Sequence, residues 1–391
     1  MKVWILIFVC MFSMPLLVAV LHFRMRKGQI LKIRQDYVKD ARYFGKSFSA
    51  LVEKALPEME NGTIMLSRQE KVLETDGKQE FVQPEIEDLV IARNTIFCPQ
   101  QEDLHFQKEI YSEKDALFVK ENIRLRAVYS KKRLLFGNKI RLLRWADAEH
   151  TVAVYDECDL GERVSSGEQL VIGFDNIFHS LYAPVIRLGQ RPEEPDRFMD
   201  GRDPRIFRMP VMNRYEYNRH YIDDDMVTES GTVPYTIISR GDIKVIEDII
   251  LQGDIHSDGA VRIMENASVL GNIFAENDIL LEKNTTVLGN IFTQGNIIFE
   301  EGASAGQPDK IISVVARGTI TFYGGNNIYG YVVSEGGGKI LKSDREVLRE
   351  YCFPGEPVHE EKITFRDLSE YENVDFQGFR GDIYVKEAIY S

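Results

Sequence analysis

Several residue types that mark common protein classes are scarce in this chain of 391 residues. Its four cysteines lie far apart and form no C-x-x-C pair, so the sequence predicts neither a zinc knuckle nor a disulfide framework. They are Cys10, Cys98, Cys158 and Cys352. Basic residues are outnumbered as well, with 48 Lys and Arg against 61 Asp and Glu, which gives a formal net charge of -13. This balance argues against a broad basic surface, and we expect no nucleic-acid partner.

The chain also lacks the short motifs that mark many cofactor-dependent and hydrolytic enzymes. It has no P-loop, no dinucleotide fingerprint, no zinc-ligand spacing and no Ser-His-Asp pattern. We therefore expect a non-enzymatic protein without a cofactor or a metal site. The acidic run from Asp223 to Asp225 could bind a divalent cation. A solvated acidic loop is the simpler interpretation of that run.

The N-terminus carries the longest apolar run of the sequence. Residues 3–23 are nearly uncharged and are long enough to cross a bilayer core of about 30 Å. A cleaved signal peptide is the alternative, but only Lys2 precedes the run and no clear A-x-A site follows it. Basic residues cluster directly after the run, at positions 24, 26, 27, 32 and 34, and the positive-inside rule then places the body in the cytoplasm. We predict a single-pass anchor at residues 1–23 in the inner membrane.

A helical pattern follows the apolar run. Apolar residues recur in steps of three and four from Ile30 to Ala55, which predicts an amphipathic helix that ends near Pro57. This helix could form a coiled-coil stalk or pack on its own domain, and the pattern leaves both open. Residues 58–85 are polar and mixed in charge. We therefore interpret residues 24–85 as a juxtamembrane helix and a linker.

The most regular part of the chain begins near Gly241. A triplet of Gly or Asn, then Asp or Asn, then Ile starts at positions 241, 253, 271, 277, 289 and 295, which differ by multiples of six. Three 18-residue units align in register, at 251–268, 269–286 and 287–304. A fixed period of this kind is typical of a repeat architecture.

Every sixth residue from Ile243 to Ala303 is apolar, with the exception of Thr285. In an α-helix, sixth neighbours would lie about 120° apart and could not share one face. A coil of three short strands buries them together and stacks successive coils at about 4.8 Å. The glycines before the isoleucines suit bends that need a left-handed backbone. The predicted core positions are Ile255, Ile273 and Ile291, and the predicted bend positions are Gly253, Gly271 and Gly289.

The same period extends upstream in a weaker form. Leu134, Val152, Leu170 and Leu188 are 18 residues apart, which predicts a solenoid-like region over 86–190. Prolines and charges break the period over 191–232, as expected of an inserted loop. The repeat covers 233–340, with a phase slip at residues 307–309, and residues 341–391 form a C-terminal tail without a period.

Two features of the upstream region allow a ligand-binding interpretation. Arg126, Arg144 and Arg163, with Trp145, could form a ligand patch on one face, although a structural ladder is the simpler interpretation. The 17 tyrosines would suit a polysaccharide surface, but composition alone does not support that function.

Residues 241–304 resemble the bactofilin family of polymer-forming bacterial cytoskeletal proteins. In that family a valine and a Gly-Asp/Asn-Ile triplet open each coil and an alanine marks its last corner, as at 269–273 with Ala267 and at 287–291 with Ala303. The resemblance implies an all-β, right-handed β-helix whose subunits join end to end into nucleotide-independent filaments beneath the membrane. The upstream region, the insertion and the tail depart from the family pattern, and any of them could cap a coil end.

The resemblance therefore implies a membrane-anchored structural protein of the bacterial envelope that assembles with itself and scaffolds envelope proteins. The alternative is a hexapeptide-repeat acyltransferase with a left-handed β-helix, which has the same period. Its hexads place Ser, Thr, Ala or Val two positions before the aliphatic residue, where this chain has Gly or Asn. Such an enzyme would need a histidine base. His256 and His179 lie in the repeats, where surface positions are the simpler interpretation.

Overall fold

The computed structural model describes Met14 and residues 40–75, 78–192, 231–234, 236–308 and 310–342. The predicted anchor, apart from Met14, most of the predicted insertion and most of the C-terminal tail lie outside the described residues. No helix within the described ranges is long and apolar enough to cross a bilayer. The described residues from Phe44 onward form a single unit, whose strands build a β-solenoid of about 13 turns with a spacing of about 18 residues. The solenoid that the period predicts is confirmed.

The solenoid begins earlier than the sequence pattern indicates. Strands β1 (Thr63–Met65) and β2 (Gln69–Thr75) form an antiparallel hairpin, and β2 pairs in parallel with β5 (Leu89–Ala92) of the next coil. Residues 58–85, expected to be a linker, therefore contain part of the first coil. Each of these strands buries one residue, Ile64 in β1 and Thr75 in β2, which is too little apolar alternation for a strand pattern to be visible.

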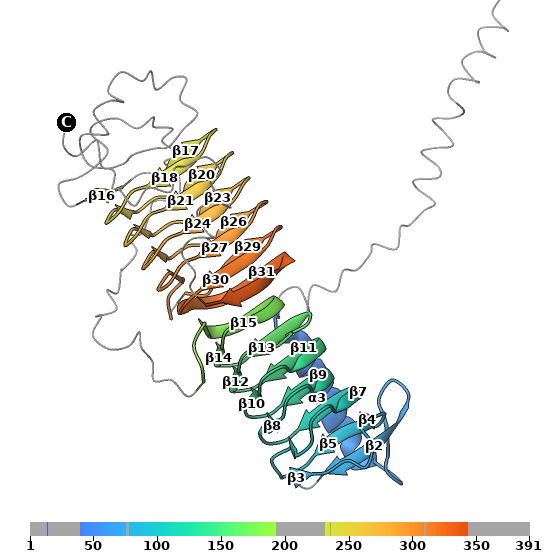
Figure 1. Ribbon diagram of the computed structural model, residues 1–391. Helices are drawn as coiled ribbons and strands as arrows, with labels where there is room; N and C mark the ends of the chain where they lie inside the picture. The colour runs from blue at the N-terminus through green and yellow to red at the C-terminus, as the bar shows by residue number, and fades with distance from the viewer. Residues whose placement is uncertain are drawn as a thin grey trace, which may run out of the picture. The chain divides into compact units, whose positions relative to one another are not determined.

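The upstream stack continues to residue 188 with parallel pairing between successive coils (Figure 1). Its other strands are β3 (Lys78–Gln79), β4 (Glu85–Ile86), β6 (Cys98–Pro99), β7 (His105–Ser112), β8 (Ala116–Phe118), β9 (Arg124–Ser130), β10 (Leu134–Phe136), β11 (Arg141–Ala148), β12 (Thr151–Val154), β13 (Arg163–Ser166), β14 (Gln169–Ile172) and β15 (Asn176–Leu188). Leu134 pairs with Val152 and Val152 with Leu170, as the period predicts. Leu170 then pairs with Ile186, so the predicted step to Leu188 is wrong by two residues.

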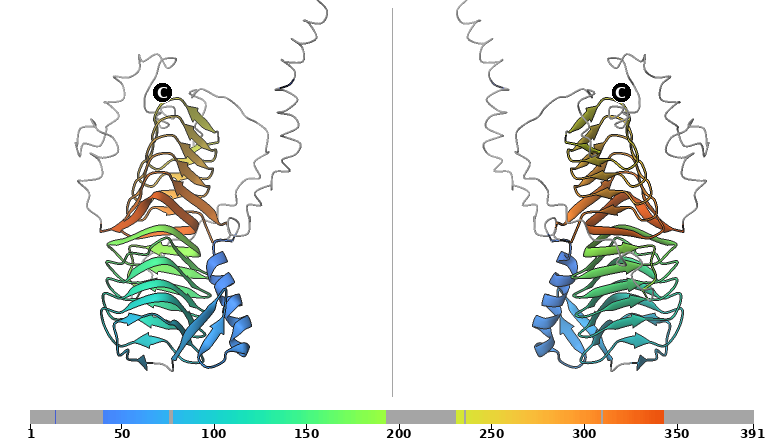
Figure 2. Two further views of the ribbon diagram at one scale, coloured as in Figure 1. Left: turned by 90° about the vertical axis from the view of Figure 1, so that its right-hand side faces the viewer. Right: turned by 90° about the vertical axis from the view of Figure 1, so that its left-hand side faces the viewer.

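A helix covers one outer face of this stack. The described helices after residue 40 are α3 (Tyr43–Ala55) and the 3-10 helix η1 (Leu56–Glu58). Val52 is fully buried among outward-facing residues of the strands, including Tyr111 and Trp145, and Phe48 meets the Trp145 ring edge-on at 5.6 Å between centroids. Figure 2 shows α3 lying along the upstream strands. Of the two alternatives for the predicted helix, the described part packs on its own domain.

The downstream stack has three short strands per coil. Its strands are β16 (Thr232–Val233), β17 (Ile237–Ser239), β18 (Ile243–Val245), β19 (Ile250–Leu251), β20 (Ile255–Ser257), β21 (Val261–Ile263), β22 (Ser268–Val269), β23 (Ile273–Ala275), β24 (Ile279–Leu281), β25 (Thr286–Val287), β26 (Ile291–Thr293), β27 (Ile297–Phe299), β28 (Ser304–Ala305), β29 (Ile312–Ala316), β30 (Ile320–Tyr323) and β31 (Asn326–Leu341). The column of sixth residues is buried along its whole length. Thr285 fits this column because its hydroxyl donates to the Glu282 carbonyl at 2.9 Å.

The phase slip is an insertion of five residues. Ile273 pairs with Ile291 at a separation of 18, but Ile291 pairs with Val314 at a separation of 23, and 23 minus 18 is five. An antiparallel bridge between Gln307 and Lys310 marks the bulge that holds the extra residues. The core column continues past it through Val314, so the insertion leaves the stacking intact.

The corners of the downstream coil correct one expectation. Gly253, Gly271 and Gly289, the predicted bend positions, do not have a positive φ. Close contact between coils instead requires glycine at positions 271 and 289, since a Cβ on Gly289 would lie 2.1 Å from the carbonyl oxygen of Gly271. The left-handed residues lie at a different corner and recur every 18 residues. They are Asp248, Asn266, Asn284 and Gly302.

The middle residue of the triplet links one coil to the next. Asn272 donates its backbone and side-chain N–H groups to the Oδ1 of Asp254, at 2.6 and 2.9 Å. Asn290 donates in the same way to the Oδ1 of Asn272, at 2.9 and 3.0 Å. The triplets that begin at Gly271 and Gly289 therefore each supply a glycine for close approach, a polar rung and a core isoleucine.

Candidate assembly site at the coil ends

The last strand of the upstream stack pairs with the last strand of the downstream stack. β15 and β31 run antiparallel and share ten register pairs, in three runs separated by irregularities. On its other edge, β31 pairs in parallel with β28, β29 and β30, so each run lies over a different strand of the preceding coil. The two stacks therefore meet end to end through their C-terminal coils, as Figure 1 shows.

Aromatic side chains from both stacks meet in this joint. The rings of Phe178 and Phe322 lie 6.3 Å apart across it, and those of Tyr182 and Tyr331 lie 4.5 Å apart on its outer side. Residues of both stacks belong to one continuous apolar core. The terminal coil of a solenoid presents unpaired backbone donors and acceptors, which act as a template for another strand. In this chain the backbone donors and acceptors of the two C-terminal coils pair with one another.

The first coil of the upstream stack is closed in a different way. Phe81 is buried against Phe106, with ring centroids 5.4 Å apart, at the end of a row of phenylalanines that meet edge to face. The Gln101 side chain holds the Phe81 backbone by accepting from its N–H at 2.7 Å and donating to its carbonyl at 2.8 Å. The Phe81 ring thus covers the end of the apolar core in the first upstream coil.

The first coil of the downstream stack differs from the other three coil ends. Its strands β16, β17 and β18 pair with β19, β20 and β21 on one side, and within the described ranges they have no strand on the other side. The Ile237 N–H donates to the Asp254 carbonyl at 2.8 Å, toward the stack. The N–H of Ile238 therefore points to the outer edge, because alternate residues of a strand point their backbone groups to opposite sides. We call the outer edge of β16–β18 the open edge.

The predicted core and bend residues all lie inside the downstream stack. Ile255, Ile273 and Ile291 are fully buried and stack directly on one another. The glycine two positions before each forms a second column, in which the Gly271 carbonyl limits the space at Gly289. These residues build the solenoid, and none of them lies at the joint or at the open edge.

The joint was not visible in the sequence pattern. The only local signal is the run of three glycines at 336–338 within a strand, which indicates close approach of another group. A Cβ on Gly338 would lie 2.1 Å from the Phe178 ring. The close partner is a residue 160 positions earlier in the chain, and no repeat marks that pairing.

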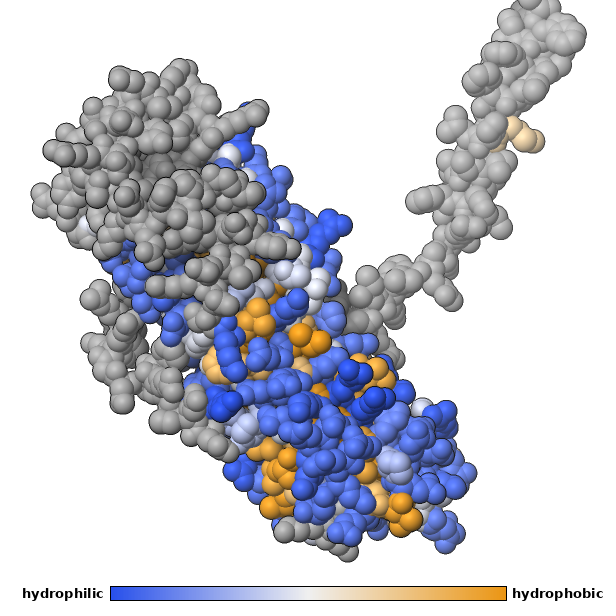
Figure 3. Space-filling model, in the orientation of Figure 1, coloured by the Kyte–Doolittle hydropathy of each residue, from blue (hydrophilic) through white to orange (hydrophobic). Residues whose placement is uncertain are grey.

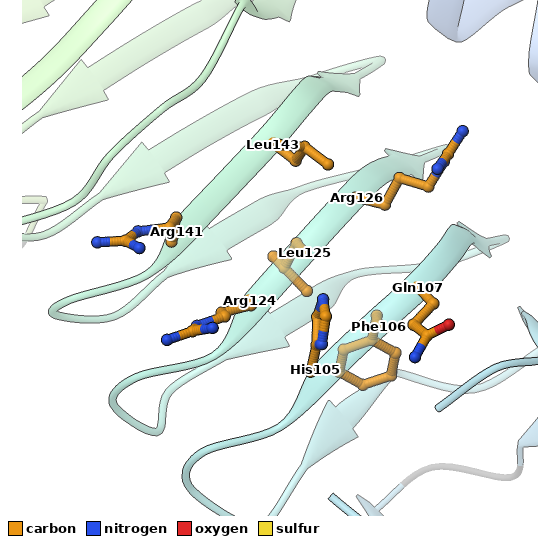
Figure 4. A pocket seen from close by; sticks show the side chains of 8 residues that line it. All are labelled: His105, Phe106, Gln107, Arg124, Leu125, Arg126, Arg141 and Leu143. Atoms are coloured by element: carbon orange, nitrogen blue, oxygen red, sulfur yellow. The ribbon is translucent and has the colours of Figure 1, made fainter. Parts of the chain in front are cut away.

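A basic pocket lies on the β7–β9–β11 face of the upstream stack (Figure 4). It has a volume of about 440 Å³ and forms where β-bulges interrupt β7 and β11 on either side of β9. His105, Arg124 and Arg141 are register neighbours on these three strands. Arg141 lies 4.0 Å from Asp159, whereas Arg124 is exposed and has no ion pair within the described part of the chain. In Figure 4 the side chains of Arg124 and Arg126 extend to opposite sides, so these guanidinium groups do not converge on one anionic group.

The predicted arginine ladder does not form. Arg163 lies in register with Trp145, which is 18 residues earlier, rather than with Arg144. Arg126 donates to Glu109 at 3.1 Å, and Arg163 lies over the Phe44 ring at 5.5 Å. The structure therefore places the arginines in separate contacts.

The two candidate histidines lie on the outside of the solenoid. His256 is exposed on β20 and lies 6.1 Å from the Phe274 ring, and His179 is exposed on β15. Within the described ranges, no three His, Cys, Asp or Glu residues come close enough to hold a metal ion, and the acidic run at 223–225 lies outside those ranges. On the face shown in Figure 3 the described surface is largely hydrophilic, with apolar groups in patches. No protein-family model, curated protein or solved structure matches this chain.

Proposed function

We propose that this chain is a membrane-anchored structural protein of the bactofilin type, which assembles with itself and scaffolds partners at the bacterial envelope. In this proposal residues 3–23 anchor it in the inner membrane, the β-helix is right-handed, and its body faces the cytoplasm. The apolar run, the basic residues after it and the Gly-Asp/Asn-Ile repeat support these assignments.

The joint between β15 and β31 is the observation that carries the proposal. It shows that two coil ends of this sequence pair through ten register pairs with a continuous core between them. Self-assembly needs the same contact between two copies. Since β15 and β31 already use the C-terminal coils, the open edge of β16–β18 is the end that we assign to contact with another copy.

Negative-stain electron microscopy of the full chain without nucleotide, together with its sedimentation profile, tests this function. We expect self-association without a cofactor. The open edge of one copy against the open edge of another gives a closed dimer, so filaments or sheets would in addition require a second contact between copies. Discrete trimers would contradict this contact and would direct the next experiment to acyl-CoA binding and to His256.

A substitution at the open edge tests the assigned contact. Ile238→Pro removes an N–H that points to this edge and leaves the Ile237 bond to the stack in place. We expect this variant to remain folded and to lose assembly. Ile238→Ala is the matched control, because it removes the same exposed side chain but keeps the N–H. Unchanged assembly of the folded proline variant would rule out the open edge as the contact.

A further inference from the structure

A row of apolar side chains on the outside of the downstream stack is buried. Ile279 and Leu281 of β24 point into the core, so Leu280 between them points outward. Leu280 is nevertheless only 1% exposed, and Ile298 and Tyr323 on the next strands are 8% and 9% exposed. These residues form a cluster of their own with the partly buried Leu341, separate from the core. We call Leu280, Ile298, Tyr323 and Leu341 the outer apolar patch.

A comparable outward position on another face behaves differently. Phe274 of β23 also alternates with two core residues, yet it is 39% exposed. Stacked strands alone therefore leave an outward side chain partly open to solvent. The burial of Leu280 requires a further group over this face.

The buried face extends from the joint to the outermost coil. Lys244, Arg262 and Leu280 are register neighbours on β18, β21 and β24. Lys244 is only 5% exposed, and Arg262 donates to Glu282 at 2.7 Å with both side chains nearly buried. From β18 to β31 the face spans five strand steps, or about 24 Å at ~4.8 Å per step. The same register column continues through Ile298 and Thr321 to the exposed Lys339 of β31, so it carries three basic residues.

The upstream stack shows how such a face is covered in this protein. Its outward aromatic residues Tyr111, Tyr129 and Trp145 are buried because α3 packs over them. α3 and η1 both contact the upstream strands, and no other helix is described after residue 40. The cover of the outer apolar patch must come from elsewhere.

We propose that the C-terminal segment, residues 343–391, docks on the outer apolar patch and covers this face. The chain leaves β31 at Leu341, which is itself part of the patch, so the segment starts on the surface that it would cover. At about 3.3 Å per extended residue, roughly eight residues cross 24 Å, far fewer than the segment contains.

The composition of the segment fits this face. It holds eight aromatic residues, and its 12 acidic against 6 basic residues give a net charge of 6 minus 12, or -6. Aromatic side chains suit the apolar positions, and the negative charge suits Lys244 and Arg262. The inference does not depend on self-assembly, since it concerns a contact within one chain.

Cysteine labelling of the full chain tests the docking. The probe is Ile298→Cys, and Phe274→Cys on the uncovered face is the matched control. Cys10, Cys98 and Cys352 are replaced by serine. Cys158 stays, because burial raises the pKa of its thiol to about 12 and keeps it unreactive toward maleimide. A protease site after Lys342 allows the segment to be cut off once the protein has folded.

We expect Ile298→Cys to react at least about tenfold more slowly than Phe274→Cys in the uncut protein. Cutting and removing the segment should bring the two rates together, and added peptide 343–391 should slow the Ile298→Cys reaction again. Protection that survives removal of the segment would overturn the proposal. If the protection of Ile298→Cys in the cut protein falls on dilution, a second copy covers the patch. If the protection is independent of concentration, residues 193–230 are the remaining cover. An unchanged Phe274→Cys rate shows that the cut protein is still folded.

Discussion

Phe178 of β15 occupies the space that a side chain at position 338 of β31 would need. A Cβ on Gly338 would lie 2.1 Å from the Phe178 ring, so only glycine fits opposite this aromatic residue. The two residues are register partners in the joint. Their fit explains how two coils with different sequences can close on one another without a gap in the core.

Gly338→Ala is therefore expected to weaken the joint. Overpacking of this kind costs about 1–3 kcal/mol, and urea unfolding of the full chain measures the loss. The double variant Gly338→Ala with Phe178→Leu should recover part of it, because leucine lacks the outer ring atoms. If the double variant is as unstable as the sum of the two single variants, the proposed contact does not couple them.

Ile273→Asp is expected to prevent folding of the downstream stack. Ile273 is fully buried between Ile255 and Ile291, so the variant would bury an unpaired charge at a cost of several kcal/mol. Phe274→Asp is the control, because the neighbouring side chain points outward and is 39% exposed. Circular dichroism and sedimentation of the two variants should separate them. A soluble, normally folded Ile273→Asp variant would refute the register.

The downstream core could be predicted because its signal repeats. One apolar residue in six and a triplet at fixed offsets make the column from Ile243 to Ala303 visible, and the structure buries all of it. The role of the triplet glycine was not predictable from composition, since both a left-handed bend and close backbone approach favour glycine. The true left-handed corner, with Asn266 and Asn284, carries an 18-residue repeat that sequence reasoning could have found.

The remaining features depend on contacts that no repeat encodes. The hairpin of β1 and β2 buries one residue per strand, so its pattern resembles that of a linker. The basic pocket forms only because bulges shift β7 and β11 relative to β9, which changes the neighbours of Arg124. The joint pairs residues such as Tyr182 and Tyr331 that lie far apart in the chain. Tertiary geometry decides each of these contacts.

The polar rung at the coil corner gives a third prediction. Asn272→Ala removes the amide that donates to Asp254 and the oxygen that accepts from Asn290. Leaving such partners unsatisfied costs about 1–3 kcal/mol. Asn277→Ala is the matched control, since this asparagine lies in the next triplet but is exposed and makes no side-chain hydrogen bond within the described residues. Thermal unfolding should show a lower midpoint for Asn272→Ala alone, and equal midpoints would argue against the rung.

The acid sensitivity of the upstream stack depends in part on Glu70. Lys108 and Arg68 both donate to its carboxylate, which holds the pKa of Glu70 below its ordinary value of 4.5, although burial opposes the shift. Since the folded-state pKa is the lower one, this contribution is complete above pH 4.5 and is lost as the pH falls through the folded-state pKa. Glu70→Gln should therefore lower stability at pH 7 and flatten the decline toward pH 3.

Glu121→Gln separates this effect from that of an ordinary surface ion pair. Lys139 donates to Glu121 at 3.0 Å and also lowers the pKa of that carboxyl, but both side chains are more than 40% exposed. Solvent and salt screen such a pair, so its removal should change stability little. The side chain of Glu70 is only 12% exposed, and its contribution should resist added salt. Urea unfolding of both variants at pH 7, at low and at high salt, measures the change in the free energy of unfolding. If both variants lose the same stability and the loss disappears in high salt, Glu70 belongs to an ordinary screened surface ion pair.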